Sequence, residues 1–225
     1  MPAGIALAGN GQLLYNLPVF RCGDAAVRND KTGGTVMAKL YFRYGAMGSS
    51  KTANAVMVRY NYMERGCKVL MLKPQLENRD GERIIKSRCG LEAECMFVEE
   101  LPQIDLSGYA CIIVDEAHFL TAAQVRQLVD IVDDYDIPVI CYGLRTDFRG
   151  NFFEGSRELM CWADTIEEIK TICWCGRKAT FNARISDGKV VKEGEQVLLG
   201  GNDKYISLCR KHWKNGDLGD SCSSR

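Results

Sequence analysis

Four short apolar segments constrain the fold of this 225-residue chain more than any other feature. The segments are residues 39–44 (KLYFRY), 67–72 (CKVLML), 111–116 (CIIVDE) and 137–144 (IPVICYGL). Nearly continuous hydrophobicity of this length is typical of parallel strands that are buried on both faces of a sheet. Helical patterns lie between the segments, and this alternation predicts an α/β fold in which helices flank a parallel sheet.

Two of the intervening segments have the periodicity of helices. The apolar residues that recur at helical spacing after the first strand are Ala53, Val56, Met57, Tyr60 and Met63. Gly66 supplies a stop for this helix. Before the last strand, Thr121 and Gln124 form a capping-box pattern at the start of a second helix. Residues 74–90 are charged and weakly patterned, which predicts a mobile loop.

The sequence between the first strand and the first helix is GAMGSSKT, residues 45–52. It follows the phosphate-loop pattern G-x-x-x-x-G-K-[ST], except that Ser50 stands where the second glycine is expected. A polar turn can match such a pattern by chance, but a position between a strand and a helix favours a phosphate-binding loop. The residues expected to bind ATP are therefore Gly45, Ala46, Met47, Gly48, Ser49, Ser50, Lys51 and Thr52. Lys51 would reach the β- and γ-phosphates, and the Thr52 hydroxyl would bind Mg²⁺.

The third apolar segment ends in two acidic residues, Asp115 and Glu116. In a phosphate-loop protein, an acid at the carboxyl end of such a strand holds Mg²⁺, which assigns that role to Asp115. Glu116 would point elsewhere and could act as a base. The alternative is that two acids simply end a strand at the surface. Because the loop and the acidic strand occur together and in the right order, we expect a P-loop NTPase-type sheet.

One group of cysteines has the spacing of a metal site. The chain has eleven cysteines, and we interpret most of them as small buried hydrophobic residues. Cys173 and Cys175 form one short cluster, and Cys209 and His212 form another. Three cysteines and one histidine suit a closed, tetrahedral zinc site, although buried thiols are the alternative. Zinc bound here would fix the base of the long segment between the clusters.

Charge and hydropathy exclude several classes of partner. The 29 basic residues balance the 29 acidic ones, so no overall field favours nucleic acid or an anionic membrane. No apolar run approaches the roughly 18 residues of a membrane span, and no secretory signal is recognisable. We therefore expect a soluble cytoplasmic protein. The letters DEAH also occur in helicase ATPases, but such enzymes need a second motor domain, so we disfavour that alternative.

Five segments together resemble the cytosolic (type II) thymidine kinase family in its bacterial form. They are GAMGSSKT, IIVDEAHFL, CYGLRTDFRGNFF, ICWCGRK and GEQVLLGGNDKYISLCRKH, and the resemblance runs from about Met37 to Trp213. It implies transfer of the γ-phosphate of ATP to the 5′-hydroxyl of thymidine, and of deoxyuridine, with Mg²⁺ and one structural Zn²⁺ per chain. It also implies a homotetramer.

The texture of the chain predicts a domain organisation, and the resemblance names the parts that it covers. Residues 1–36 would be a disordered N-terminal extension, and residues 37–170 the P-loop kinase domain. Residues 171–214 would form a small C-terminal zinc-containing lasso domain, and residues 215–225 a tail. A long lasso loop pinned by zinc would read the thymine base largely through backbone groups.

Individual roles follow from the same resemblance. Glu116 is implied as the general base, Arg79 as a residue near the phosphates, and Tyr205 as a residue near the sugar. The implied lasso positions are Gln196, Val197, Leu198, Leu199 and Gly200. The implied walls of the nucleoside pocket are Met47, Phe119 and Phe148. Each of these wall residues has the alternative of being plain core, and Tyr205 that of bracing the zinc loop.

Two positions depart from the family pattern. The family usually has glycine at the position of Ser50, and commonly glutamine at that of His118. Ser50 puts a side chain where the backbone must approach phosphate, which predicts impaired catalysis. We interpret His118 as a neighbour of the ATP and Mg²⁺ site rather than as a new catalytic group. A nucleotide-binding regulator that kept the fold and lost turnover is the remaining alternative.

Overall fold

The computed structural model describes residues 37–77, 83–196 and 205–219. Its centre is a six-stranded sheet with the spatial order β5-β2-β6-β7-β1-β8, and all its pairings are parallel. The strands are β1 (Leu40–Tyr44), β2 (Lys68–Lys73), β5 (Met96–Phe97), β6 (Tyr109–Val114), β7 (Val139–Gly143) and β8 (Thr165–Glu168). The parallel α/β prediction is confirmed, and the four apolar segments of the sequence supply β1, β2, β6 and β7.

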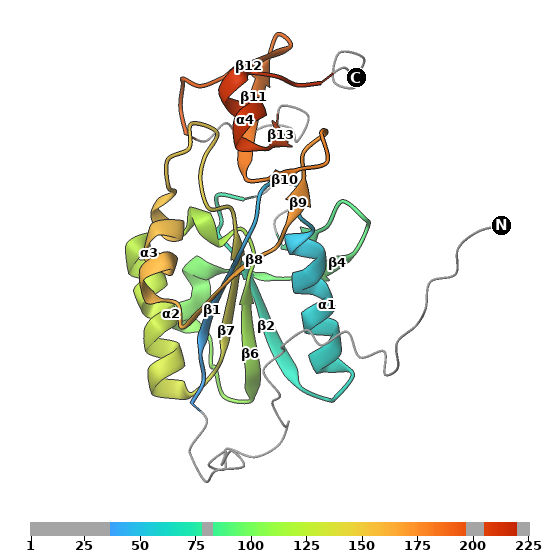
Figure 1. The fold of residues 1–225 in the computed structure, drawn as a ribbon. Helices are drawn as coiled ribbons and strands as arrows, with labels where there is room; N and C mark the ends of the chain where they lie inside the picture. Colours follow the sequence, from blue (N-terminus) through green and yellow to red (C-terminus); the bar gives the residue numbers. More distant parts are fainter. Residues whose placement is uncertain (1–36, 78–82, 197–204, 220–225) are drawn as a thin grey trace, which may run out of the picture.

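Helices cover both faces of this sheet (Figure 1). They are α1 (Lys51–Met63) on one face, α2 (Ala122–Tyr135) and α3 (Glu154–Trp162) on the other, with short 3-10 turns η1 (Val98–Gln103) and η2 (Ala117–Phe119). Successive residues of β6 alternate between the two cores. Ile112 and Val114 pack in the core that includes α2, whereas Ile113 packs with residues of α1. Burial on both faces explains why the strand sequences are hydrophobic without interruption.

The capping box at the start of α2 is present as predicted. The Thr121 hydroxyl accepts the Gln124 backbone N–H at 3.2 Å, and the Gln124 side chain accepts the Thr121 N–H at 2.9 Å. These reciprocal bonds satisfy two donors that the first helical turn leaves unpaired.

The prediction of a loop over residues 74–90 is wrong in part. β3 (Ile84–Lys86) lies in this region and forms an antiparallel hairpin with β4 (Glu92–Glu94), which follows directly after it. The central residues of the two strands, Ile85 and Ala93, are buried in the core that includes α1. Only the central residue of each three-residue strand is buried, which leaves no readable period, so the tertiary contact with α1 decides the structure.

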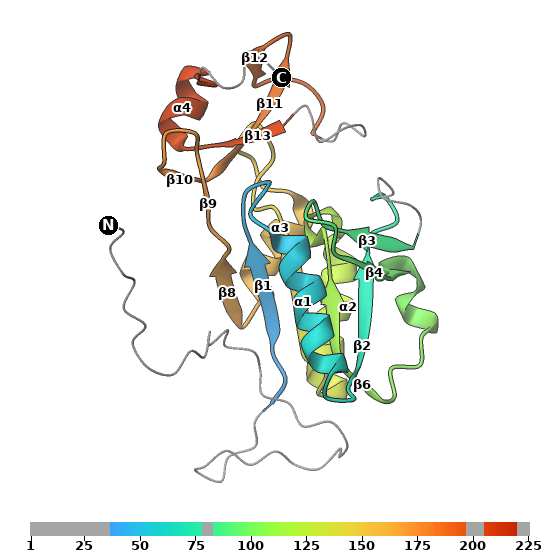
Figure 2. The same cartoon turned by 90° about the vertical axis from the view of Figure 1, so that its right-hand side faces the viewer.

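The C-terminal part forms a smaller unit beyond one end of the main sheet (Figure 2). Its elements are β9 (Thr171–Ile172), β10 (Lys178–Ala179), β11 (Phe181–Ser186), β12 (Lys189–Val191), β13 (Tyr205–Leu208) and α4 (Arg210–Asn215). The strands form a β9–β10 hairpin and a three-stranded antiparallel sheet in the order β12-β11-β13. Within the described ranges, none of the helices has the length and apolar character needed to cross a bilayer.

The smaller unit is joined to the loop that follows β1. The backbone N–H of Met47 donates to the Asn182 side chain on β11 at 2.8 Å, and the Met47 carbonyl accepts the hydroxyl of Ser207 on β13. These bonds place β11 and β13 directly over the loop at the carboxyl edge of the main sheet.

Candidate active site

A cavity of about 520 Å³ lies between the carboxyl edge of the main sheet and the smaller unit. It brings together most of the residues that the sequence singles out. Those that line it are Met47, Gly48, Ser50, Lys51, Thr52, Asp115, Glu116, His118, Phe119, Phe148, Gln196 and Tyr205. Arg79, Val197, Leu198, Leu199 and Gly200 lie outside the described residues.

The remaining residues of the loop, Gly45, Ala46 and Ser49, do not line the cavity but shape the loop around Lys51. Gly45 has no room for a side chain, because an added Cβ would overlap the carbonyl oxygen of Ile169. Lys51 is buried and donates to the carbonyls of Gly45 at 3.3 Å and Ala46 at 3.0 Å, and to the hydroxyl of Ser49 at 3.4 Å. The loop therefore curves tightly around the Lys51 ammonium group, at the N-terminus of α1.

Ser50 adopts the left-handed conformation, with φ 60° and ψ 27°. It is the N-cap residue of α1, and its side chain makes no capping hydrogen bond. Glycine occupies this region of backbone space freely, whereas a residue with a Cβ is disfavoured by about 1–2 kcal/mol. Serine in place of the expected glycine therefore strains the backbone as well as adding a side chain to the loop.

If the chain phosphorylates thymidine with ATP, as the resemblance implies, replacement of Ser50 by glycine should increase kcat/KM for ATP about tenfold, which corresponds to about 1.4 kcal/mol of transition-state stabilisation. The substitution removes the Cβ at the left-handed position and leaves Lys51 and the helix N-terminus in place. Steady-state kinetics with saturating thymidine and varied ATP measure the effect.

Ser50→Ala is the matched control, because alanine keeps the Cβ and loses only the hydroxyl. We expect kcat/KM for ATP of the Ser50→Ala variant to be no higher than that of the parent protein. If the glycine variant also matched the parent, serine would be fully accommodated at this position and the explanation by strain would be wrong.

Asp115 has the environment of a cation ligand. It is 3% exposed, and its Oδ1 has no hydrogen-bond partner among the residues that the structure describes. Burial, and then the neighbouring Glu116, raise the pKa of Asp115 to about 7, although a hydrogen bond with Thr52 opposes this. A buried carboxylate with an unpaired oxygen beside a hydroxyl fits hard divalent cations such as Mg²⁺, which prefer oxygen ligands.

Glu116 is a second residue of the cavity with a left-handed backbone, at φ 51° and ψ 34°. Glutamate seldom adopts this conformation, and strained backbone of this kind concentrates at functional sites. The conformation turns the chain sharply after Asp115, and the Glu116 side chain lines the cavity with 20% of its surface exposed. Two adjacent carboxylates thus have different environments, one buried and one accessible.

His118 lies beside Glu116 and against the aromatic wall. Its Nδ1 is 3.4 Å from Glu116 Oε2 and accepts the Leu144 backbone N–H at 3.3 Å. Its ring centroid is 4.0 Å from that of Phe119 and 4.6 Å from that of Phe153. These contacts place the buried imidazole between the accessible carboxylate and the apolar wall.

Several residues of the cavity were missed by sequence reasoning. Among them are Lys73, Glu77, Leu144, Asp147, Phe153 and Asn182. Leu144, Asp147 and Phe153 belong to the segment CYGLRTDFRGNFF, in which only Phe148 was chosen. Asn182 gave no signal, because only the tertiary arrangement brings β11 to the loop.

Lys73 is a second buried cation of the cavity. It is 1% exposed, donates to the Ile84 carbonyl at 3.0 Å and lies 3.6 Å from Glu77 Oε2. A lysine at the end of an apolar run is easily interpreted as the first surface residue, which is why the sequence did not indicate it.

The cysteine–histidine cluster assembles as the sequence predicts. The candidate ligand atoms of Cys173, Cys175, Cys209 and His212 lie within 4.8 Å of one another. Cys209 caps α4 and His212 follows in its first turn, whereas the other two residues come from the β9–β10 turn. His212 Nε2 lies 3.8 Å from Asp217 Oδ2, which is a carboxylate–histidine arrangement common around zinc. A mostly buried set of three thiols and one imidazole fits structural Zn²⁺.

Comparisons with known proteins agree with the family that the sequence resembles. The thymidine kinase family model matches residues 38–213. A thymidine kinase of Rhodopirellula baltica is 48% identical over 187 residues, which cover 79% of this chain and 89% of that protein. One from Legionella pneumophila strain Lens is 47% identical over 194 residues, covering 81% and 92%. One from Salmonella typhimurium is 45% identical over 188 residues, covering 80% and 92%.

Proposed function

Because the chain belongs to the thymidine kinase family, we propose that it transfers the γ-phosphate of ATP to the 5′-hydroxyl of thymidine to give thymidine monophosphate. One observation carries this proposal. A single cavity joins a phosphate loop, a buried carboxylate and an accessible carboxylate to an aromatic wall. Phosphoryl transfer to a nucleoside needs these parts within one enclosed space.

The phosphate end of the cavity is formed by the loop and β6. We assign ATP binding to residues 45–52, with Lys51 and the N-terminal N–H groups of α1 facing the phosphates. Asp115 and Thr52 would hold Mg²⁺, which neutralises phosphate charge when bound. The Glu116 carboxylate accepts the proton of the attacking hydroxyl, a step that requires it to be ionised and within hydrogen-bond reach.

The nucleoside end is formed by residues from both units. Met47, Phe119 and Phe148 provide apolar surface for the base, and Tyr205 and Gln196 line the cavity from the smaller unit. Family membership excludes the helicase alternative, and no described feature favours a regulator without turnover. A homotetramer, a cytoplasmic location and acceptance of deoxyuridine are further parts of the proposal, and they rest on family resemblance.

Nucleoside choice tests the proposal. We expect thymidine and deoxyuridine to be phosphorylated, and kcat/KM for deoxycytidine to be at least about tenfold lower, since an unpaired buried polar group costs about 1–3 kcal/mol. Backbone groups that match the N3–H and carbonyls of thymine cannot also match the inverted donor pattern of cytosine. Release of ADP, measured at fixed ATP and varied nucleoside, gives kcat/KM for thymidine, deoxyuridine and deoxycytidine. Equal rates on deoxycytidine would contradict the assignment.

A further inference from the structure

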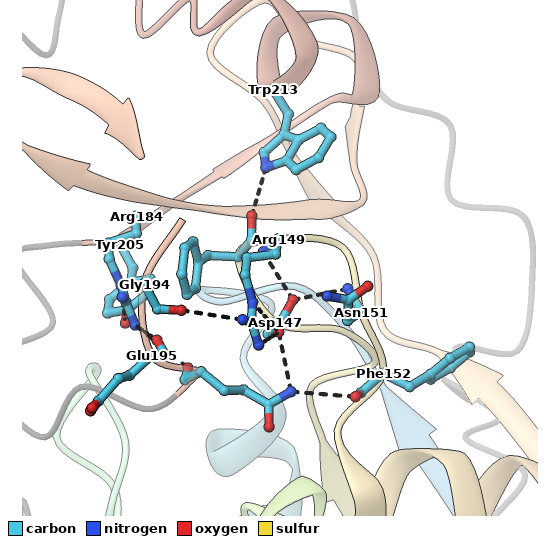
Figure 3. A network of polar contacts seen from close by, with 11 residues as sticks. Asp147, Arg149, Asn151, Phe152, Arg184, Gly194, Glu195, Tyr205 and Trp213 are labelled. Carbon is cyan, nitrogen blue, oxygen red and sulfur yellow. Dashed lines mark hydrogen bonds and ion pairs between the residues drawn. The ribbon is translucent and has the colours of Figure 1, made fainter. Parts of the chain in front are cut away.

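A partly buried polar network lies beside the nucleoside end of the cavity (Figure 3). Its centre is the carboxylate of Asp147, whose side chain is fully buried. Oδ1 accepts the backbone N–H groups of Arg149 and Asn151, both at 2.9 Å. Oδ2 accepts the Arg149 guanidinium at 3.1 Å and the side-chain amide of Gln196 at 3.1 Å. A carboxylate that receives this many donors is held in one orientation, so it fixes the Gln196 side chain in turn.

Two arginines hold the segment that contains Gln196, here called the lasso stem (residues 194–196). Arg149 donates to the carbonyl of Gly194 at 3.2 Å. Arg184 on β11 donates from Nη2 to the carbonyl of Glu195 at 2.8 Å and to that of Gln196 at 3.5 Å. Side chains from outside the stem thus bind three successive carbonyls, as Figure 3 shows in part, and these two guanidinium groups set the path of the stem.

Arg184 also contacts the wall of the pocket. Its guanidinium carbon lies 3.7 Å from the ring centroid of Phe148, and its Nε donates to the Tyr205 hydroxyl at 2.9 Å. Arg184 is 5% exposed and is not among the residues that line the cavity. It therefore touches Phe148, Tyr205 and the stem at once and can influence a ligand only through them.

We propose that Arg184 and Arg149 are positioning residues for the nucleoside, and that Asp147 is the carboxylate which Arg149 and Gln196 share. They hold Phe148, Tyr205 and Gln196 in the arrangement that binds thymidine, an assignment that rests on the proposed function. The residues assigned to phosphate and proton transfer lie on other elements, α1 and the end of β6. Loss of the network should consequently weaken nucleoside binding much more than ATP binding or the chemical step.

Arg184→Lys is the main test. Lysine keeps the charge, but its compact ammonium group cannot stack on Phe148 and also donate to Tyr205 and the stem. We expect KM for thymidine to rise about tenfold or more, while KM for ATP and kcat at saturating thymidine stay within about threefold. A merely structural role would instead lower kcat and the Tm, and it would change the two KM values alike.

Arg149→Lys is a second variant, and its substitution is not at a buried position. Arg149 is part-exposed, with 32% of its side chain accessible, so the protein should fold even if Arg184→Lys does not. We expect a smaller rise in KM for thymidine in the same direction. The double variant should show less than the product of the two single effects, because both arginines hold one stem.

Arg126→Lys is the matched control. Arg126 also stacks on an aromatic ring, with its guanidinium carbon 4.1 Å from the Trp162 centroid, and also pairs with a carboxylate, that of Glu158. It lies on α2 outside the cavity, so its replacement should leave KM for thymidine unchanged.

Thymidine and ATP kinetics, zinc content and Tm are measured for the parent and all variants. An active parent whose Arg184 and Arg149 variants keep the parental KM for thymidine would overturn the assignment. So would variants that lose affinity for thymidine and ATP equally. A parent that cannot phosphorylate thymidine would overturn the proposed function instead, and the assignment with it.

Discussion

Replacement of Glu116 by glutamine should lower kcat by about 10²–10⁴-fold, the usual contribution of a positioned general base. Glutamine keeps the size and the left-handed backbone turn, but it cannot accept the proton of the 5′-hydroxyl. ATP binding should largely survive, because the phosphate loop and Asp115 contribute separate groups to the cavity. Steady-state kinetics and calorimetry with ATP measure the two effects on one preparation.

Glu158→Gln provides the control for the loss of a carboxylate. Glu158 lies on α3 and pairs with Arg126, away from the cavity, so its replacement should leave kcat close to that of the parent. Near-normal turnover of the Glu116 variant would remove this residue from the role of base. Loss of ATP binding in that variant would indicate a structural effect instead.

Loss of zinc should abolish thymidine binding. We expect about one zinc ion per chain, bound by Cys173, Cys175, Cys209 and His212, and such sites contribute folding free energy directly. The cluster holds α4, whose Trp213 donates to the Phe148 carbonyl at 3.0 Å. Removal of the metal would therefore release a contact to the nucleoside wall as well as the base of the lasso.

Metal analysis and thymidine calorimetry on the chelated protein and on Cys209→Ser test this expectation. Cys161→Ser is the matched control, because Cys161 is an exposed thiol on α3 outside the cluster. That variant should retain both zinc and thymidine binding. A protein that contains no zinc and binds thymidine normally would contradict the assignment.

The main sheet, and the position of the loop over residues 45–52 between its strand and helix, could be predicted from sequence because their signals are local. Uninterrupted hydrophobicity predicts the strands at residues 111–116 and 137–144. The spacing of Thr121 and Gln124 predicts the capping box. The cysteine–histidine cluster could also be predicted, since few arrangements of cysteine and histidine suit a metal. In each case, the residues that specify the feature lie close together in the chain or have rare chemistry.

The rest of the site depends on contacts between distant segments, which no local sequence pattern predicts. The sequence indicated a departure at Ser50, but not that its backbone would be left-handed. Lys73 resembled a surface residue, and Arg184 resembled an ordinary polar residue of a short strand. Its partners, the lasso stem and Phe148, come from other segments, so only the assembled fold shows what this arginine holds.

Transfer of labelled phosphate tests the central claim most directly. The purified full chain is incubated with Mg²⁺, γ-labelled ATP and thymidine, and the products are separated. The account predicts labelled thymidine monophosphate in equal amount to the ADP formed, and loss of this product in Glu116→Gln. A protein that binds ATP and transfers no label to thymidine would contradict the account and favour a nucleotide-binding regulator.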